Sequence, residues 1–184
     1  MCEKNPLMYS SSLRFAIFAS RLLLLFLVCG GFSGCYTFRG ISIDPDVNTF
    51  FIQPFEIQAP NAPPNVGFDF VEKLKQKIRT ETRLTLKNSE PDVEFSGKIT
   101  DYRVVPVAPK PGELVSLNRL EVTIRVNYTS NKDEKKSWTV ERDFRHFAEF
   151  NNDRDLLSIQ DQLLSGTIFP QLLEDVFNAA FNDW

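Results

Sequence analysis

Few side chains in this 184-residue sequence could carry out catalysis or hold a metal ion. The single histidine, His146, follows Asp143 by three positions within a predicted strand, and strand alternation puts the two side chains on opposite faces of a sheet. A hydrolase built on this pair is an alternative, but a structural histidine is the favoured interpretation. Acidic pairs near positions 44, 141 and 153 lack the spacing of a calcium loop, and the scattered glycines form no phosphate-binding motif. The sequence therefore predicts a protein that is not an enzyme and has no catalytic residue, metal or cofactor.

The charge balance argues against a nucleic-acid partner. The chain has 21 Lys and Arg against 24 Asp and Glu, a net charge of -3. A protein that wraps DNA or RNA needs a basic surface to neutralise phosphates, and this composition supplies none. Three cysteines and one histidine are also too few for the ordinary zinc modules.

The N-terminal segment has the layout of a bacterial export signal. Three basic residues precede an apolar run over residues 22–28, and small residues follow it up to Cys35. A membrane-spanning anchor is the alternative, but the uncharged stretch 22–34 is shorter than the roughly 20 residues that a spanning helix needs. We therefore predict that residues 1–34 are a cleaved signal peptide and that residues 35–184 form one domain.

The end of that segment, Phe32-Ser33-Gly34-Cys35, resembles the lipobox of bacterial lipoproteins. Phe32 departs from the pattern, which usually has an aliphatic residue there. The resemblance implies that Cys35 becomes the new N-terminus and carries acyl chains such as palmitate. Each buried methylene contributes about 0.8 kcal/mol, so such a cysteine would hold the domain on a membrane without a spanning helix. A plain secreted protein with an incidental cysteine is the alternative.

The rest of the chain contains five stretches with strand-like composition. They cover residues 36–43, 47–57, 92–107, 117–130 and 138–147. The last three are expected to form an antiparallel meander, because a short loop joins the final two. Pro54 interrupts the second stretch, which is expected to lie at an edge or to end in a bulge.

Two helices complete the predicted fold. Val71, Leu74 and Ile78 recur at helical spacing within residues 66–82, with basic residues between them. Residues 158–184 form a second amphipathic helix, which Pro170 is expected to kink or to split. The predicted fold class is α+β: an antiparallel or mixed sheet of about four strands with both helices packed on one face, in the order β-α-β-β-β-α.

The proline-rich connection between the third and fourth strand-like stretches is predicted to be a protruding hairpin tip. Pro109 and Pro111 prevent regular structure there, and Leu114 and Val115 place apolar side chains beside it. These four residues are candidates for a partner interface.

Several short segments resemble the LptE family of lipopolysaccharide-assembly lipoproteins, in its Bacteroidetes branch. The most specific are Phe-x-Gly-x-Ile-Thr-x-Tyr at residues 95–102 and the C-terminal sequence 173–184. The others lie at residues 35–40, 84–89, 118–120 and 144–150. Together they span nearly the whole chain after the predicted signal peptide.

The resemblance implies a lipoprotein of the outer membrane that faces the periplasm, tethered through Cys35. Members of the family plug the LptD β-barrel and help its assembly and the delivery of lipopolysaccharide to the cell surface. Arg39, Lys110 and Arg119 are the candidates for contact with lipopolysaccharide, because its phosphates suit Lys and Arg side chains. The alternative is a periplasmic lipoprotein that carries lipid, which predicts an internal apolar cavity.

Overall fold

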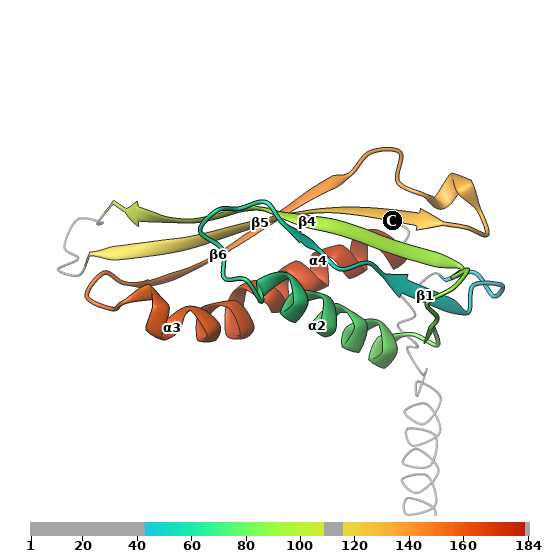
Figure 1. The fold of residues 1–184 in the computed structure, drawn as a ribbon, viewed down its shortest axis with the longest axis horizontal. Helices are drawn as coiled ribbons and strands as arrows, with labels where there is room; N and C mark the ends of the chain where they lie inside the picture. The colour runs from blue at the N-terminus through green and yellow to red at the C-terminus, as the bar shows by residue number, and fades with distance from the viewer. Residues whose placement is uncertain (1–42, 109–115, 183–184) are drawn as a thin grey trace, which may run out of the picture. The chain divides into compact units, whose positions relative to one another are not determined.

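The computed structural model describes residues 43–108 and 116–182, which belong to one compact unit, residues 40–184. In this unit a mixed sheet forms one layer and the helices form a second layer on one of its faces (Figure 1). The predicted α+β class is confirmed. The predicted signal peptide, Cys35 and the strand expected over residues 36–43 lie almost entirely outside the described residues.

The sheet in the described residues has six strands, two more than the sequence predicted. They are β1 (Thr49–Ile52), β2 (Glu56–Ile57), β3 (Thr85–Leu86), β4 (Val93–Val107), β5 (Leu117–Ser130) and β6 (Arg142–Asn151). The order is β3-β1-β4-β5-β6, and β2 pairs with β4 farther along. The prediction missed β3 and the separation of β1 from β2, because two-residue strands are too short to show a period.

The sheet combines two kinds of pairing. β1 lies parallel to both β3 and β4, with Phe50 opposite Val93, whereas β4, β5 and β6 form the predicted antiparallel meander. Pro54 lies between β1 and β2, where its missing N–H and fixed φ interrupt the pairing. Backbone bonds from Gln53 to Phe95 and from Gln58 to Ile99 hold the two short strands against β4.

The start of the last strand was predicted too early. A short 3-10 helix, η2 (Glu134–Lys136), follows β5, and β6 begins only at Arg142. Trp138 belongs to the intervening loop: its backbone N–H donates to the Tyr128 carbonyl, and its ring lies 5.8 Å from the Tyr128 ring. Val140 in this loop is 73% exposed. The apolar residues that suggested the start of a strand therefore belong to a loop, which packs against β5 through Trp138.

Helix α2 spans Val66–Glu81, as predicted, and Leu74 and Ile78 on its inner face are fully buried. The C-terminal helical segment contains α3 (Leu156–Leu163), a π-helical turn (Leu164–Ile168) and α4 (Phe169–Phe181). In a regular helix the ring of Pro170 would meet the carbonyl four residues earlier, and the wider π turn before it relieves that contact. The predicted disruption at Pro170 therefore takes the form of a π turn.

Aromatic side chains join the two layers. The Phe70 ring of α2 lies 5.5 Å from the rings of Phe55 and Phe169, and Phe95 of β4 lies 5.9 Å from Phe181 of α4. Such tilted and edge-on pairs add about 0.5–1.5 kcal/mol each beyond the burial of their area. The described residues bury 31 apolar side chains in one cluster between sheet and helices.

Asp92 fixes the place where β1 enters the sheet. Its Oδ2 accepts hydrogen bonds from the backbone N–H groups of Asn48 and Thr49, each 2.9 Å long, and these bonds lower the pKa of Asp92 to about 2. The side chain is 14% exposed. Folding therefore favours the ionised form of Asp92.

We expect Asp92→Asn to lower the free energy of unfolding at pH 7 by on the order of 2 kcal/mol. A lowered pKa contributes stability above the unfolded value near 4, and this contribution is lost as the pH falls toward 2. Urea unfolding at pH 7, 4 and 2.5 measures both proteins. The difference between them should shrink as the pH falls, and a difference that stays constant would show that Asp92 does not act through its charge.

None of the helices in residues 43–108 and 116–182 is long and apolar enough to span a membrane.

Candidate functional site

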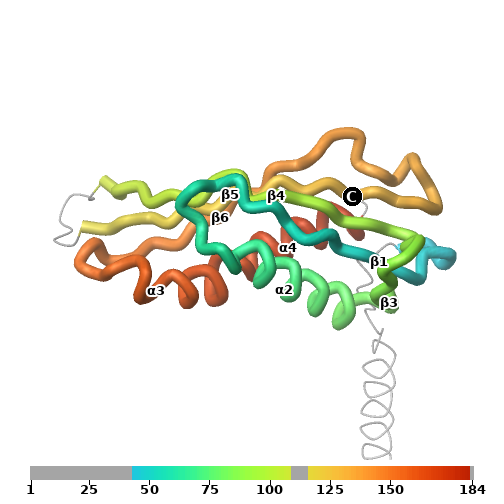
Figure 2. The backbone as a smooth tube through the Cα atoms, viewed as in Figure 1, coloured from blue at the N-terminus to red at the C-terminus, as the bar shows by residue number. Residues whose placement is uncertain are grey.

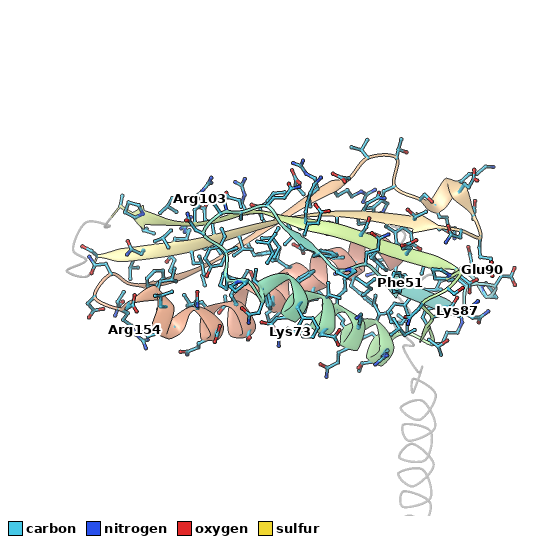
Figure 3. The ribbon with its side chains drawn as sticks, viewed as in Figure 1. Phe51, Lys73, Lys87, Glu90, Arg103 and Arg154 are labelled. Atoms are coloured by element: carbon cyan, nitrogen blue, oxygen red, sulfur yellow. The ribbon has the colours of Figure 1, made fainter. Side chains whose placement is uncertain are left out.

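The sheet has one face that the helices do not cover. Side chains alternate along each strand, so the residues next to the buried ones point to this open face. Arg103 lies on it, on the side of the sheet opposite Lys73 of α2 (Figure 3). The charged side chains of β4, β5 and β6 that alternate onto the open face are Glu94, Lys98, Asp101, Arg103, Arg119, Glu121, Arg125, Asp143, Arg145 and Glu149. Five are basic and five are acidic, so the open face is charged but neutral.

Register brings opposite charges into direct cross-strand pairs. Arg103 is the partner of Glu121 and their atoms Nη2 and Oε2 are 2.9 Å apart; Arg119 pairs with Glu149 at 2.6 Å. In a third pair, Arg125 Nε donates to Asp143 Oδ1 at 2.6 Å and Nη2 donates to Oδ2 at 2.9 Å.

The third pair shows the electrostatic effect of this arrangement. The hydrogen bond from Arg125 lowers the pKa of the Asp143 carboxyl, and the same contact raises the pKa of Arg125. Because these side chains are exposed, each pair contributes little to folding. Their main effect is to hold planar, charged groups in fixed positions on a flat surface.

Arg119, a predicted lipopolysaccharide contact, lies within this face. Besides its bond to Glu149, its guanidinium carbon lies 4.0 Å from the centre of the Phe147 ring, which is 44% exposed. Arg119 is therefore held by a carboxylate and an aromatic ring at once, and an anionic ligand would have to compete with Glu149. Its assignment to lipopolysaccharide stays a prediction.

The other predicted site residues are outside the described residues. Val107 and Leu117 are register partners, so β4 and β5 form a hairpin, and its far end lies past the start of α2 (Figure 2). The connection contains the predicted lipopolysaccharide contact Lys110 and the interface candidates Pro109, Pro111, Leu114 and Val115. Those residues, like Cys35 and Arg39, are not described.

The one histidine has a structural contact. His146 Nε2 lies 2.6 Å from Asp175 Oδ2 of α4, so it links β6 to the helix layer. Asp143 is bonded to Arg125 on the open face, which confirms that His146 and Asp143 do not share a face. Within residues 43–108 and 116–182, no group of three or more His, Cys, Asp and Glu is placed to hold a metal ion.

Sequence reasoning missed the open face as a site. The sequence does contain a pattern that indicates this face. Every second residue of β5 is polar, namely Arg119, Glu121, Thr123 and Arg125, and these side chains point away from the buried residues that identified the strand. The register of the strands could not be predicted from the sequence. The register places each of these arginines opposite a carboxylate and not opposite another basic side chain.

Comparison with known proteins gives one family. A sequence model for LptE, described as lipopolysaccharide-assembly, matches residues 47–180. A search of curated protein sequences finds no match.

Several solved structures are partly similar to this chain, at low sequence identity. A minor lipoprotein from Acinetobacter baumannii has a TM-score of 0.44 and 10% identity, over 71% of this chain and 90% of its own. Lipoprotein B from Nitrosomonas europaea has a TM-score of 0.43 and 12% identity, over 71% and 80%. A putative neuraminyllactose-binding hemagglutinin homolog from Helicobacter pylori has a TM-score of 0.46 and 9% identity, over 78% and 88%.

Proposed function

Because the chain belongs to the LptE lipopolysaccharide-assembly family, we propose that it is a non-enzymatic outer-membrane lipoprotein that plugs an LptD-type β-barrel and helps it to assemble. Residues 1–34 would be removed as a signal peptide, and Cys35 would carry the lipid anchor. The rest of the chain would form one domain on the periplasmic side. The match of the family over residues 47–180 is the observation that carries this proposal.

The open face supports the plug. The interior of a large outer-membrane barrel is polar and contains water. A protein seated there needs a surface whose charges are already paired, because unpaired charges are costly wherever the contact excludes water. The pairs Arg103–Glu121, Arg119–Glu149 and Arg125–Asp143 meet that need, since each arginine brings its own carboxylate.

The alternative is a lipoprotein that carries lipid. A carrier needs an apolar cavity large enough for acyl chains, between sheet and helices. In the described residues this space holds fully buried side chains from both layers, among them Phe95, Ile124, Ile168, Leu172 and Phe177. A filled core favours a plug over a carrier.

Affinity purification from detergent-solubilised outer membranes tests the proposal. We expect the tagged protein to recover a large β-barrel in near-equal amount, and Cys35→Ser to recover less of it. The double variant Arg119→Glu/Arg125→Glu should recover at least tenfold less barrel, because each new carboxylate faces Glu149 or Asp143 and leaves the face strongly negative.

Lys73→Glu/Arg79→Glu is the matched control, because it makes the same change in charge on α2, away from the open face. It should keep barrel recovery within twofold of the unmodified protein. Thermal unfolding of both variants checks that they fold, which exposed ion pairs permit. Recovery of the protein with bound lipid and no barrel would refute the plug and support the carrier.

A further inference from the structure

Strand β6 forms one edge of the sheet. In the strand order β3-β1-β4-β5-β6 it pairs with β5, and no strand of residues 43–108 and 116–182 pairs with its outer side (Figure 1). We call this outer side of Arg142–Asn151 the β6 edge. It is 10 residues long and contains neither proline nor lysine, the residues with which natural proteins commonly block such edges. An edge of this length offers its backbone N–H and C=O groups to a further strand.

The backbone groups that the β6 edge presents follow from the pairing with β5. The Asn152 N–H donates to the carbonyl of the residue opposite it, Ser116, at 3.1 Å. Bonded pairs alternate with non-bonded pairs along an antiparallel ladder, so the even-numbered residues of β6 bond to β5. The odd-numbered residues, from Asp143 to Asn151, therefore turn their N–H and C=O groups outward.

The side chains of the same odd-numbered residues lie on the open face, and two of them have unused bonding capacity. Arg145 donates through Nε to Thr123 Oγ1 at 3.1 Å, and its Nη atoms pair with no carboxylate in the described residues. Glu149 accepts both bonds from Arg119 on Oε1, which leaves Oε2 without a partner in that part of the chain. The β6 edge thus carries a donor and an acceptor four residues apart, with Phe147 midway between them.

We propose that the β6 edge pairs with the β6 edge of a second copy of this chain, antiparallel across a twofold axis at Phe147. An axis perpendicular to the sheet keeps the helices of both copies on the same side of the joined sheet. Arg145 of each copy then lies opposite Glu149 of the other, and Asp143 lies opposite Asn151. The five outward residues of each edge form five bonded pairs, and each pair exchanges two hydrogen bonds, which gives ten.

The charges favour this register over the neighbouring ones. A shift of two residues in one direction sets Asp143 opposite Glu149, and like charges directly opposite each other destabilise a sheet. The same shift in the other direction sets Phe147 opposite Glu149 and Arg145 opposite Asn151, so no opposite charges meet. A shift of one residue would join the open face of one copy to the helix-covered face of the other.

Aromatic side chains on the helix-covered face match in the same register. Phe144 of each copy lies opposite Phe150 of the other, and cross-strand aromatic pairs stabilise sheets. Phe144 is partly buried, and its ring lies 6.0 Å from the ring of Trp138. The pair goes beyond the proposed function, which concerns the domain inside a barrel. It is a form of the free lipoprotein, and it keeps the β6 edge closed until a barrel takes up the domain.

Complementary charge variants test the pair in solution. The chain is exported with its three cysteines replaced by serine, which removes acylation as a cause of association. Analytical ultracentrifugation should show a dimer that depends on concentration. Arg145→Glu and Glu149→Arg should each weaken dimerisation at least tenfold, because each sets like charges opposite one another at two places. An equimolar mixture of the two variants should regain the affinity of the parent within threefold, because opposite charges meet again at both places.

Arg103→Glu is the matched control for the charge variants. Arg103 lies on the open face of β4, and β5 separates it from β6. It makes the same change in charge as Arg145→Glu and should dimerise like the parent. Thermal unfolding of all three variants checks that they fold.

Crosslinking locates the twofold axis. In the same cysteine-free chain, Phe147→Cys should crosslink two copies through a short bifunctional thiol reagent, because Cα atoms of a bonded pair lie about 5.5 Å apart. Asn151→Cys is the matched control. Its two copies would lie eight residues apart along the strands, about 27 Å, and should not crosslink.

Three results would each overturn the proposal. A chain that stays monomeric at every concentration measured would show that the β6 edge does not pair with itself. Crosslinking of Asn151→Cys in place of Phe147→Cys would place the contact in another register. A mixture that associates no better than either charge variant alone would exclude the contact between Arg145 and Glu149. These experiments involve neither barrel nor lipid, so their result is independent of the purification that tests the proposed function.

Discussion

Replacing Phe95 by alanine is expected to lower the free energy of unfolding by about 3–5 kcal/mol. Phe95 is fully buried on β4, and its ring lies 5.1 Å from Tyr128 of β5 and 5.9 Å from Phe181 of α4. The substitution removes contacts within the sheet and between the two layers at once. The surrounding backbone belongs to paired strands, so it has little freedom to close the cavity.

Urea unfolding measured by circular dichroism checks this value. Phe68→Ala is the control, because Phe68 lies on α2 and is 68% exposed. Truncating an exposed phenylalanine should change the free energy of unfolding by less than about 0.5 kcal/mol. Equal effects of the two substitutions would mean that Phe95 does not join the layers as described.

Gly97→Val is expected to destabilise the fold by about 3 kcal/mol. A Cβ atom at this position would lie 2.6 Å from two carbons of the Phe55 ring and 2.7 Å from the backbone oxygen of Arg125. Valine favours strands, so propensity alone predicts a gain in stability. The contact with backbone on the neighbouring strand overrides that gain, because β5 cannot move without losing its pairing.

Gly166→Ala is the matched control for this prediction. Nothing lies within 4 Å of a Cβ placed on Gly166, which is in the π turn. Alanine should leave stability unchanged or raise it by up to about 1 kcal/mol, since glycine is a poor helix former. Thermal unfolding of both variants shows whether each substitution lowers or raises the stability of the fold. A Gly97 variant as stable as the parent would exclude the close approach of Phe55.

The same geometry gives a physical meaning to the Phe-x-Gly-x-Ile-Thr-x-Tyr segment that carried the family resemblance. Phe95, Ile99 and Tyr102 are buried under the helices, and Gly97 leaves the space that the Phe55 ring fills. Between Ile99 and Asp101 the register shifts, so the extra residue Thr100 restores the inward position of Tyr102. The residue types of this segment are therefore explained by the packing of β4.

Long periodic elements could be predicted from the sequence. The strand expected over residues 117–130 is β5, with the same bounds, and α2 ends one residue before the predicted position. Both have a strong period over 14 or more residues, so local pattern and tertiary environment agree. The sequence could not predict β2 and β3, which are strands only because β4 and β1 offer them partners.

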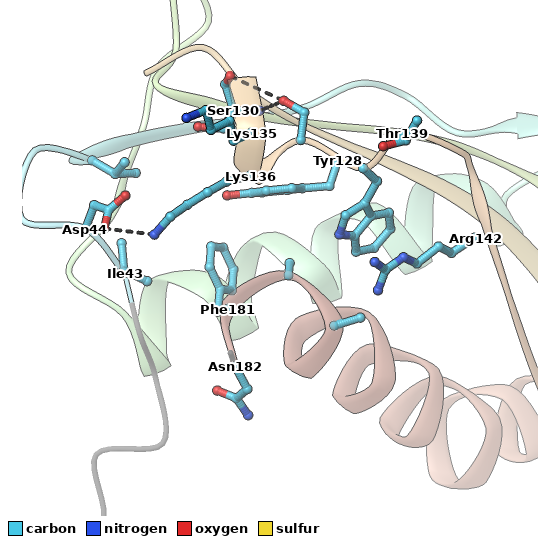
Figure 4. Close-up of a pocket in the computed structure, with 15 residues that line it drawn as sticks. Ile43, Asp44, Tyr128, Ser130, Lys135, Lys136, Thr139, Arg142, Phe181 and Asn182 are labelled. Atoms are coloured by element: carbon cyan, nitrogen blue, oxygen red, sulfur yellow. Dashed lines mark hydrogen bonds and ion pairs between the residues drawn. The ribbon is translucent and has the colours of Figure 1, made fainter. Parts of the chain in front are cut away.

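The candidate sites depend on contacts between distant residues, which local patterns do not contain. His146 meets Asp175, 29 residues later, and Lys136 meets Asp44, 92 residues earlier. A pocket of about 290 Å³ combines residues near 43, 130–142 and 180, three segments that no motif connects (Figure 4).

The parallel pairing of β1 has a kinetic consequence. β4, β5 and β6 are joined by short connections, whereas β1 must wait for β4, about 40 residues later, before Phe50 can pair with Val93. Closing a longer loop costs more chain entropy, and local contacts form faster. In a folding order that begins with local contacts, the meander forms early and β1 joins late. The strand that lies nearest in sequence to the proposed anchor is therefore secured only after the meander, and β3, which pairs with β1, follows it.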